Sequence, residues 1–325
     1  MKQTWFKQLG YEQNPFLINP FKETTPLIGQ EQQLEDAIYY TKSGSILFIQ
    51  ANQGCGKTKF LRTLIDSFRG KIIYVDASKE TKVINIEELL TKKNGLSGKL
   101  FGSKPKGMVL LLDNVDELSM VNLERLKYYF DQGFLHSVVF TGQDFKAVGF
   151  PKSLQQRIGK RIISLDGLTE DQAVALAYAR LDEDPHDSDV IISRSQIITV
   201  FKASSSPREF LIHLHRVFEE MHLTDADQVT ADHLAILKED LDDEDREELH
   251  EELGQPIVDP IAFTTPKGHK IMKIGKYYRC PDVDMFCGNC GAIVRDEDVK
   301  CPECFAVFEE EETKDLETKQ GEMNA

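Results

Sequence analysis

The segment from Ser45 to Lys59 constrains the fold more than any other part of this chain. It reads SILFIQANQGCGKTK, a short apolar run followed by a loop with two glycines, and an apolar pattern of helical spacing comes next. A strand, a glycine-containing loop and a helix in this order are typical of a phosphate-binding loop. Gly54 and Gly56 allow a tight turn that gathers backbone N–H groups, and the start of the helix adds its positive end.

This loop predicts how a nucleoside triphosphate would be held. Lys57 would reach the β- and γ-phosphates, and the Thr58 hydroxyl would ligate Mg²⁺. Ala51 stands where such loops usually begin with glycine, and alanine is a small replacement. Cys55 is expected to fill space rather than to act as a nucleophile. The residues predicted to bind the nucleotide are Gln53, Gly54, Cys55, Gly56, Lys57, Thr58 and Lys59.

A second strand supplies the other half of the expected site. The run MVLLL at 108–112 is fully apolar, as strands of a buried parallel sheet are, and it ends at Asp113. Asp113 would hold Mg²⁺ through water and position the Thr58 hydroxyl. Further strands are expected at 71–76, 137–140 and 161–165. Their alternation with helices predicts an α/β fold with a parallel sheet covered on both faces.

Four of the six cysteines form two CxxC pairs with ten residues between them, Cys287 with Cys290 and Cys301 with Cys304. Each pair makes a knuckle whose thiolates face one point, so the four predict a tetrahedral Zn²⁺ site in a small zinc ribbon. With four protein ligands the metal would be structural. The adjacent stretch 267–279 offers cations and tyrosine rings to nucleic acid, or its tyrosines form the core of the ribbon.

The net charge, the apolar runs and the cysteines limit the kinds of partner and compartment that we expect for this chain. The net charge of −15 argues against a protein that coats nucleic acid through bulk charge, but the acid is concentrated at 239–252 and 309–312, which leaves room for a local basic face. No apolar run approaches the ~20 residues of a membrane helix, and the N-terminus has no apolar signal core. The cysteine pattern suits a reducing compartment. We expect a cytoplasmic protein without a membrane partner.

The order of several segments resembles AAA+ ATPases, of the kind found in origin-recognition and initiator-loading proteins and in secretion-pathway and transposition ATPases. The similarity extends over residues 14 to about 220. The matching pieces are NPF at 14–16, PLIGQEQQLE at 26–35, ANQGCGKT at 51–58, LLLDNVDEL at 110–118, LQQRIGKRIIS at 154–164, LDGLTEDQAVALAYARL at 165–181 and SSSPREFL at 204–211.

The resemblance implies further site residues. Thr141, or Gln143 two residues on, would be a first sensor that contacts the γ-phosphate or the attacking water. Arg208 would be a second sensor at the start of a lid helix. Arg157 or Arg161 would be an arginine finger that reaches the site of a neighbouring subunit, which implies self-association.

One position departs from the family pattern. The metal-binding aspartate is normally followed by a glutamate that orients the attacking water, and here Asn114 follows Asp113. Asparagine aligns a water but does not take a proton. Either Asp116 or Glu117 substitutes, or hydrolysis is slow and the protein works mainly as a nucleotide-dependent switch.

Three functions follow as hypotheses. The first is an ATPase that assembles on DNA or on a DNA-bound protein complex and remodels or loads it. The second is an ATP-gated scaffold that recognises a protein partner through the ribbon with little turnover. The third is a signalling switch of the STAND type. The implied cofactors are ATP, Mg²⁺ and Zn²⁺.

The expected organisation has six parts. They are a lead segment at 1–30, an AAA+ α/β nucleotide-binding domain at 31–166, a helical lid at 167–223, an acidic helix and linker at 224–266, a zinc ribbon at 267–308 and an acidic tail at 309–325.

Overall fold

The computed structural model describes most of the first 238 residues and only short pieces beyond them. The described residues are 4–68, 72–79, 107–183 and 190–238, the single residues 249 and 253, and backbone segments at 263–264, 270–274, 277–279, 285–286 and 293–294. No helix among them is long and apolar enough to cross a membrane.

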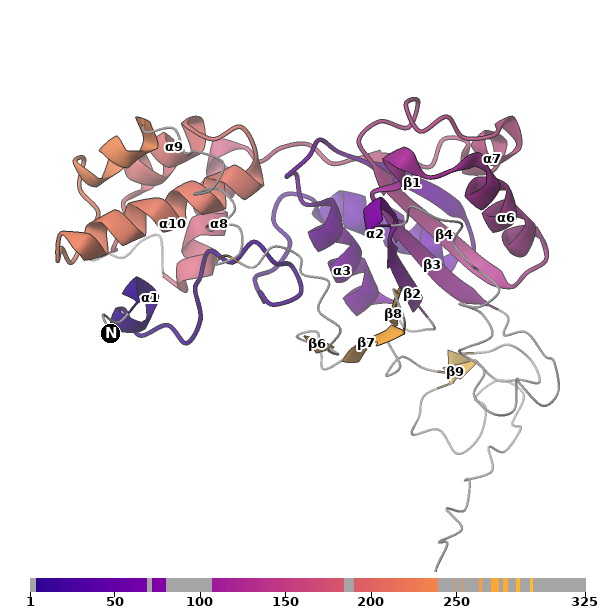
Figure 1. The fold of residues 1–325 in the computed structure, drawn as a ribbon, viewed down its shortest axis with the longest axis horizontal. Helices are drawn as coiled ribbons and strands as arrows, with labels where there is room; N and C mark the ends of the chain where they lie inside the picture. The colour runs from indigo at the N-terminus through magenta and orange to yellow at the C-terminus, as the bar shows by residue number, and fades with distance from the viewer. Residues whose placement is uncertain are drawn as a thin grey trace, which may run out of the picture.

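Five parallel strands form the centre of the molecule, as predicted, in the order β5-β1-β4-β3-β2 (Figure 1). Because β4 lies between β1 and β3, the carboxyl end of β4 separates the phosphate-binding loop after β1 from the acid at the end of β3. The strands are β1 (Ile46–Gln50), β2 (Ile72–Asp76), β3 (Met108–Asp113), β4 (Leu135–Gly142) and β5 (Ile162–Ser164).

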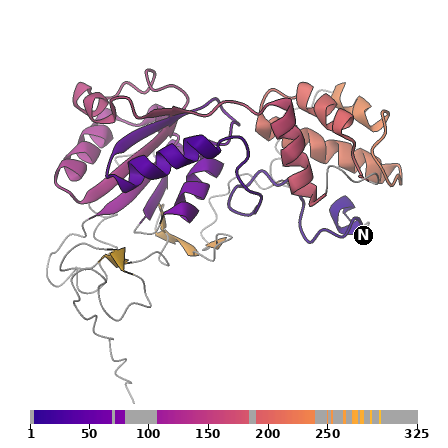
Figure 2. The ribbon, with the colours of Figure 1, turned by 180° about the vertical axis from the view of Figure 1, so that it is seen from behind.

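Helices cover both faces of this sheet, which gives a three-layer α/β architecture. Successive strand residues point to opposite faces, so Leu47 and Ile49 belong to one core cluster and Ile46 and Phe48 to the other. Helices α2 (Glu31–Lys42) and α3 (Lys57–Ser67) lie on the first face, and α6 (Met120–Asp131) and α7 (Lys152–Ile158) on the second (Figures 1 and 2).

A helical unit lies at the other end of the molecule in Figure 1. It contains α8 (Glu170–Leu181), α9 (Arg194–Lys202), α10 (Pro207–Leu223) and the 3-10 helix η3 (His233–Lys238). Capping boxes start α8 and α9, with Thr169 and Ser193 as the capping residues, and Ser206 caps α10. Within the segment 224–266, where an acidic helix and linker were expected, the structure describes the 3-10 helix η3, which packs on α10.

The N-terminal segment belongs to the core of this lid. Trp5, in α1 (Trp5–Gln8), is 2% exposed and packs between Phe16 and Phe218. Its indole N–H donates a 3.0 Å hydrogen bond to Nδ1 of His215 on α10. The side chain of Asn14 approaches the same nitrogen at 3.1 Å. Residues 4–30 are therefore a structural part of the lid and a strap that connects it to the sheet domain.

The C-terminal part of the chain extends the central sheet. Strand β8 (Tyr277–Arg279) pairs antiparallel with the edge of β2, followed by β7 (Lys270–Ile274) and β6 (Phe263–Thr264). A separate hairpin joins β9 (Met285–Phe286) to β10 (Ile293–Val294). Strands β7 and β8 lie at the start of the expected zinc ribbon, and they cover the edge of the parallel sheet formed by β2, the strand that ends at Asp76.

Candidate nucleotide-binding site

The phosphate-binding loop connects β1 to α3, as predicted. Gly54 and Gly56 have φ values of 78° and 87°, a conformation that favours glycine. A Cβ at Gly54 would also lie 2.7 Å from Oγ of Ser206. Both the backbone conformation and the close contact therefore require glycine at this position. Ala51 does not have a positive φ, which explains why alanine serves where the loop usually starts with glycine.

The ammonium group of Lys57 lies at the centre of the loop. It donates hydrogen bonds to the backbone carbonyls of Ala51 at 2.8 Å and Asn52 at 3.2 Å. Burial lowers the pKa of Lys57, and the carboxylates of Asp113 and Asp116 oppose that shift. An anionic phosphate beside this partly buried ammonium group would interact with it more strongly than in water and would favour its charged form.

Asp113 lies at the end of β3, fully buried, and accepts hydrogen bonds from three hydroxyl groups. Thr58 donates to Oδ2 at 2.6 Å, Tyr74 donates to Oδ2 at 2.8 Å, and Thr141 donates to Oδ1. Burial raises the pKa of Asp113, and these three hydrogen bonds act in the opposite direction. The structure thus brings Thr58, Asp113 and Thr141 together, although they come from three different elements.

Asn114 occupies the position where the family has the glutamate that orients the attacking water. Asn114 has a φ of 56°, in the left-handed region that asparagine tolerates better than most residues. Its backbone N–H donates to the Thr141 hydroxyl at 3.0 Å, and its side-chain amide donates to Oδ1 of Asp76 at 3.2 Å. Of the two substitutes considered above, Asp116 accepts from the backbone N–H of Gln143 at 2.7 Å. The side chain of Glu117 lies outside the described residues.

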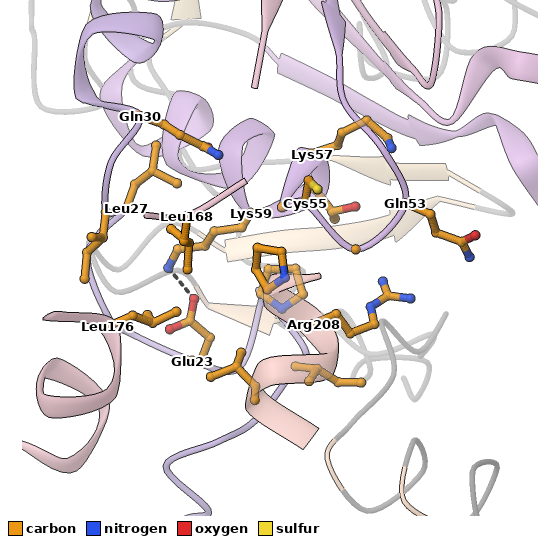
Figure 3. Close-up of a pocket in the computed structure, with 18 of the residues that line it drawn as sticks. Glu23, Leu27, Gln30, Gln53, Cys55, Lys57, Lys59, Leu168, Leu176 and Arg208 are labelled. Carbon is orange, nitrogen blue, oxygen red and sulfur yellow. Dashed lines mark hydrogen bonds and ion pairs between the residues drawn. The ribbon is translucent and has the colours of Figure 1, made fainter. Parts of the chain in front are cut away.

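A cavity of about 540 Å³ connects these groups to the lid. Figure 3 shows that its two sides differ: Lys57, Gln53 and Arg208 lie on one side, and the apolar Leu168 and Leu176 lie on the other. The volume is within the range of about 300–1,000 Å³ that small-molecule sites occupy. One side has the charge to hold phosphates, and the other has the apolar surface to hold a ring.

Gln30, at the start of α2, faces the apolar side of this cavity (Figure 3). It is 6% exposed, and its amide nitrogen approaches the backbone carbonyl of Asp166 at 3.5 Å. Its amide oxygen is buried without a hydrogen-bond partner in the described part of the chain. Because a buried acceptor without a partner is costly, a donor on a bound ligand would relieve that cost.

The lid reaches the phosphate-binding loop through the first turn of α10. The backbone N–H of Arg208 donates to the carbonyl of Gly54 at 3.2 Å, and the Arg208 side chain lines the cavity. Burial lowers the pKa of Arg208, and the Asp113 carboxylate opposes that shift. The positive ends of α3 and α10 both meet the cavity, so two helix dipoles add to the charges of Lys57 and Arg208.

Lys59, which we predicted to bind the nucleotide, has a different set of partners. Its ammonium group pairs with the carboxylate of Glu23, which is 4% exposed, and that carboxylate also lies 3.4 Å from Arg180 on α8. Arg180 further donates to the carbonyls of Pro15 and Leu17 in the strap. Lys59 therefore helps to join α3, the strap and the lid at the wall of the cavity.

The two candidate arginine fingers lie outside the cavity lining. Arg157 on α7 is 52% exposed and forms a 2.8 Å ion pair with Asp131. Arg161 donates to the carbonyls of Arg157 and Ile158, so its guanidinium caps the end of α7.

Cys287, Cys290, Cys301 and Cys304 are the predicted zinc ligands. All four lie outside the described residues, and among the described residues no group of three or more metal-type side chains occurs. Zinc binding stays a prediction. Cys55 is buried, and burial raises the pKa of its thiol, as expected for a residue that fills space.

Three functional candidates were missed by the sequence reasoning. Tyr74 and Asp76 come from β2 and Gln30 from the start of α2. The sequence shows that Asp76 ends a strand, but only the strand order, which places β2 beside β3, puts it next to Asp113. Tyr74 carried no signal, since its position in an apolar strand predicts only a core residue.

The strand order, the phosphate-binding loop, the strand-end aspartate and the helical lid define an AAA+ fold. Similar solved structures include the Orc1 protein of Aeropyrum pernix in complex with DNA, with 15% identity and a TM-score of 0.52 over 73% of this chain and 69% of that chain. A RuvB mutant of Thermotoga maritima has 20% identity and a TM-score of 0.50 over 72% and 79%. No family model and no curated protein matches the chain.

Proposed function

We propose that this chain binds ATP with Mg²⁺ in the cavity between the sheet domain and the lid. Lys57, Thr58 and Arg208 line that cavity, and the buried Asp113 accepts a hydrogen bond from Thr58; this arrangement carries the proposal. Oxygen donors suit Mg²⁺, so Thr58 would ligate it and Asp113 would hold its water shell. When bound, Mg²⁺ would neutralise phosphate charge.

The nucleotide would act by changing how the lid is held. Arg208 and Gly54 already join the lid to the loop, and the γ-phosphate would add a second contact through the Arg208 guanidinium. ATP and ADP would differ in this one contact, so the lid position would report which nucleotide is bound.

We further propose that this change controls assembly on DNA or on a DNA-bound protein complex. The fold shared with Orc1 bound to DNA supports the proposal by analogy of fold. Self-association would place an arginine of one copy in the site of the next. Arg157 suits that role better than Arg161, because Arg157 is held by an exposed ion pair with Asp131, whereas the Arg161 guanidinium is hydrogen-bonded to two carbonyls at the end of α7.

A second candidate function is an ATP-gated scaffold that turns over little ATP and recognises a protein through its zinc ribbon. Asn114 favours it, because no acid follows the metal-binding aspartate directly. ATP binding and turnover measured with and without double-stranded DNA separate the two. Turnover that rises at least about tenfold with DNA supports the DNA-dependent ATPase. Tight ATP binding with unchanged, negligible turnover supports the scaffold, and absence of ATP binding rejects both.

A further inference from the structure

We propose that Asp76 supplies the carboxylate that accepts the proton of the attacking water in ATP hydrolysis, in place of the acid absent at position 114. This inference rests on the proposed ATP site. It concerns which residue completes that site, and it predicts that the wild-type chain hydrolyses ATP.

The hydrogen bond between Asn114 and Asp76 is the first observation. A carboxylate only accepts, so the Asn114 amide must present its nitrogen to Oδ1 of Asp76, at 3.2 Å. The amide oxygen of Asn114 is then the atom that can accept from a water. An acceptor that orients a water and a carboxylate that takes its proton are thus one hydrogen bond apart.

The placement of Asp76 in the sheet is the second observation. Strands β2 and β3 are parallel neighbours, and Asp76 is in register with Asp113. Asp76 also lines the same cavity as Asn114 and Lys57. The carboxylate therefore lies at the carboxyl edge of the sheet, where the phosphate-binding loop and the metal-binding aspartate also lie.

The carboxylate of Asp76 is held in a fixed orientation. Ser78 donates to Oδ1 from its hydroxyl at 2.7 Å and from its backbone N–H at 3.3 Å, within the 3-10 turn η1 (Ala77–Lys79). A general base must be positioned as well as basic, and these bonds together with that of Asn114 position it.

Asp116 has a different task. Its Oδ1 accepts from the backbone N–H of Gln143 at 2.7 Å, and a Cβ at Gly142 would lie 2.9 Å from that oxygen. Asp116 therefore fixes the turn after β4, which carries Thr141. Asp116 lines the same cavity, but in the described part of the chain it is Asp76 that is hydrogen-bonded to Asn114, the residue in the place of the family glutamate.

The reaction step balances without another reactant. The water oxygen forms a bond to the γ-phosphorus as the bond from that phosphorus to the bridging oxygen breaks. The electron pair of the broken bond stays on the β-phosphate of ADP, and one proton of the water passes to Asp76. The products are ADP and inorganic phosphate, to which the proton is finally released.

The test uses the full-length chain with Asp76→Asn, which keeps the shape and loses the base. We expect the turnover number for ATP to fall at least ~100-fold while the dissociation constant for ATP changes less than about threefold. We also expect weaker binding of ADP with aluminium fluoride, which mimics the transferring phosphoryl group. The exchange variant Asp76→Asn with Asn114→Glu should recover turnover at least about tenfold over Asp76→Asn alone, because it returns a carboxylate to the family position.

Several results would overturn this inference. They are a wild-type chain that binds ATP without hydrolysing it, an Asp76→Asn variant that hydrolyses ATP within about threefold of wild type, and a loss of turnover in Asp116→Asn but not in Asp76→Asn. Each leaves the proposed ATP site standing. By contrast, a wild-type chain that does not bind ATP at all would reject the proposed function itself.

Discussion

The Thr58 hydroxyl donates a 2.6 Å hydrogen bond to Oδ2 of Asp113. This contact joins the first turn of α3 to the end of β3 across the intervening β4, and Thr141 on β4 completes it by donating to Oδ1. The two residues from which a magnesium site would be built are therefore in place within the protein, together with the strand-end hydroxyl that would sense the phosphate.

Burial of Asp113 predicts a pH-dependent stability. Because the folded-state pKa of Asp113 is raised, the folded ligand-free protein holds its proton more tightly than the unfolded chain does. The free energy of unfolding should therefore fall as the pH rises from the ordinary carboxyl pKa of the unfolded chain to the raised pKa of Asp113 in the folded protein.

The Asp113→Asn variant removes this charge. We expect it to melt at a higher temperature than wild type at pH 8 without nucleotide, by roughly 2–4 °C per kcal/mol, and the gap should narrow as the pH is lowered towards the ordinary carboxyl pKa. Addition of Mg²⁺ and ATP should stabilise wild type but not the variant. A gap that does not change with pH, or a variant that melts lower than wild type at pH 8, would contradict the account.

Arg208 should distinguish ATP from ADP. If its guanidinium contacts the γ-phosphate, Arg208→Ala should reduce the preference for ATP over ADP by about tenfold, since a charge-assisted hydrogen bond is lost only for ATP. Calorimetric titration of both nucleotides measures the ratio. Arg194→Ala is the matched control, because Arg194 lies in the lid but is 57% exposed in a surface ion pair. An unchanged ratio in Arg208→Ala would remove the sensor role.

Gln30 should select the base. Its unpartnered amide oxygen can accept from the exocyclic amine of adenine, whereas guanine presents an oxygen at that position. We expect Gln30→Leu to reduce the affinity for ATP at least about tenfold more than the affinity for GTP. Competition between ATP and GTP for binding to the Gln30→Leu variant measures the effect. The control is Gln132→Leu, since Gln132 is an exposed glutamine. Equal losses of ATP and GTP would show that Gln30 shapes the cavity without reading the base.

The four ribbon cysteines should bind about one zinc ion per chain. Metal analysis of the purified protein should find zinc, and Cys287→Ser should release most of it because three thiolates remain. Cys280→Ser is the control, since Cys280 lies outside both CxxC pairs. Zinc content that is absent from wild type, or equal in both variants, would contradict the zinc prediction.

The sequence was informative wherever chemistry depends on neighbours along the chain. The phosphate-binding loop and the aspartate after MVLLL could both be predicted from local patterns, and the structure describes them where expected. The parallel sheet followed from the alternation of strands and helices, and the similarity to the AAA+ fold was indicated by the order of the motifs.

Contacts between distant segments could not be predicted in the same way. The strand order places β2 beside β3, and only then does Asp76 meet Asn114. The place of Trp5 in the lid depends on packing against Phe218, which no local pattern encodes. The ion pair of Lys59 with Glu23 could not be predicted for a similar reason, because Glu23 comes from the strap.

The most direct test of the central claim is calorimetric titration of Mg²⁺ and ATP into wild type and Lys57→Ala, with Lys146→Ala, an exposed lysine, as control. We predict one ATP per chain for wild type and for the control, and an affinity at least about tenfold lower for Lys57→Ala, since an ammonium–phosphate contact of more than about 1.4 kcal/mol is removed. Equal affinity for ATP in wild type and Lys57→Ala would contradict the account.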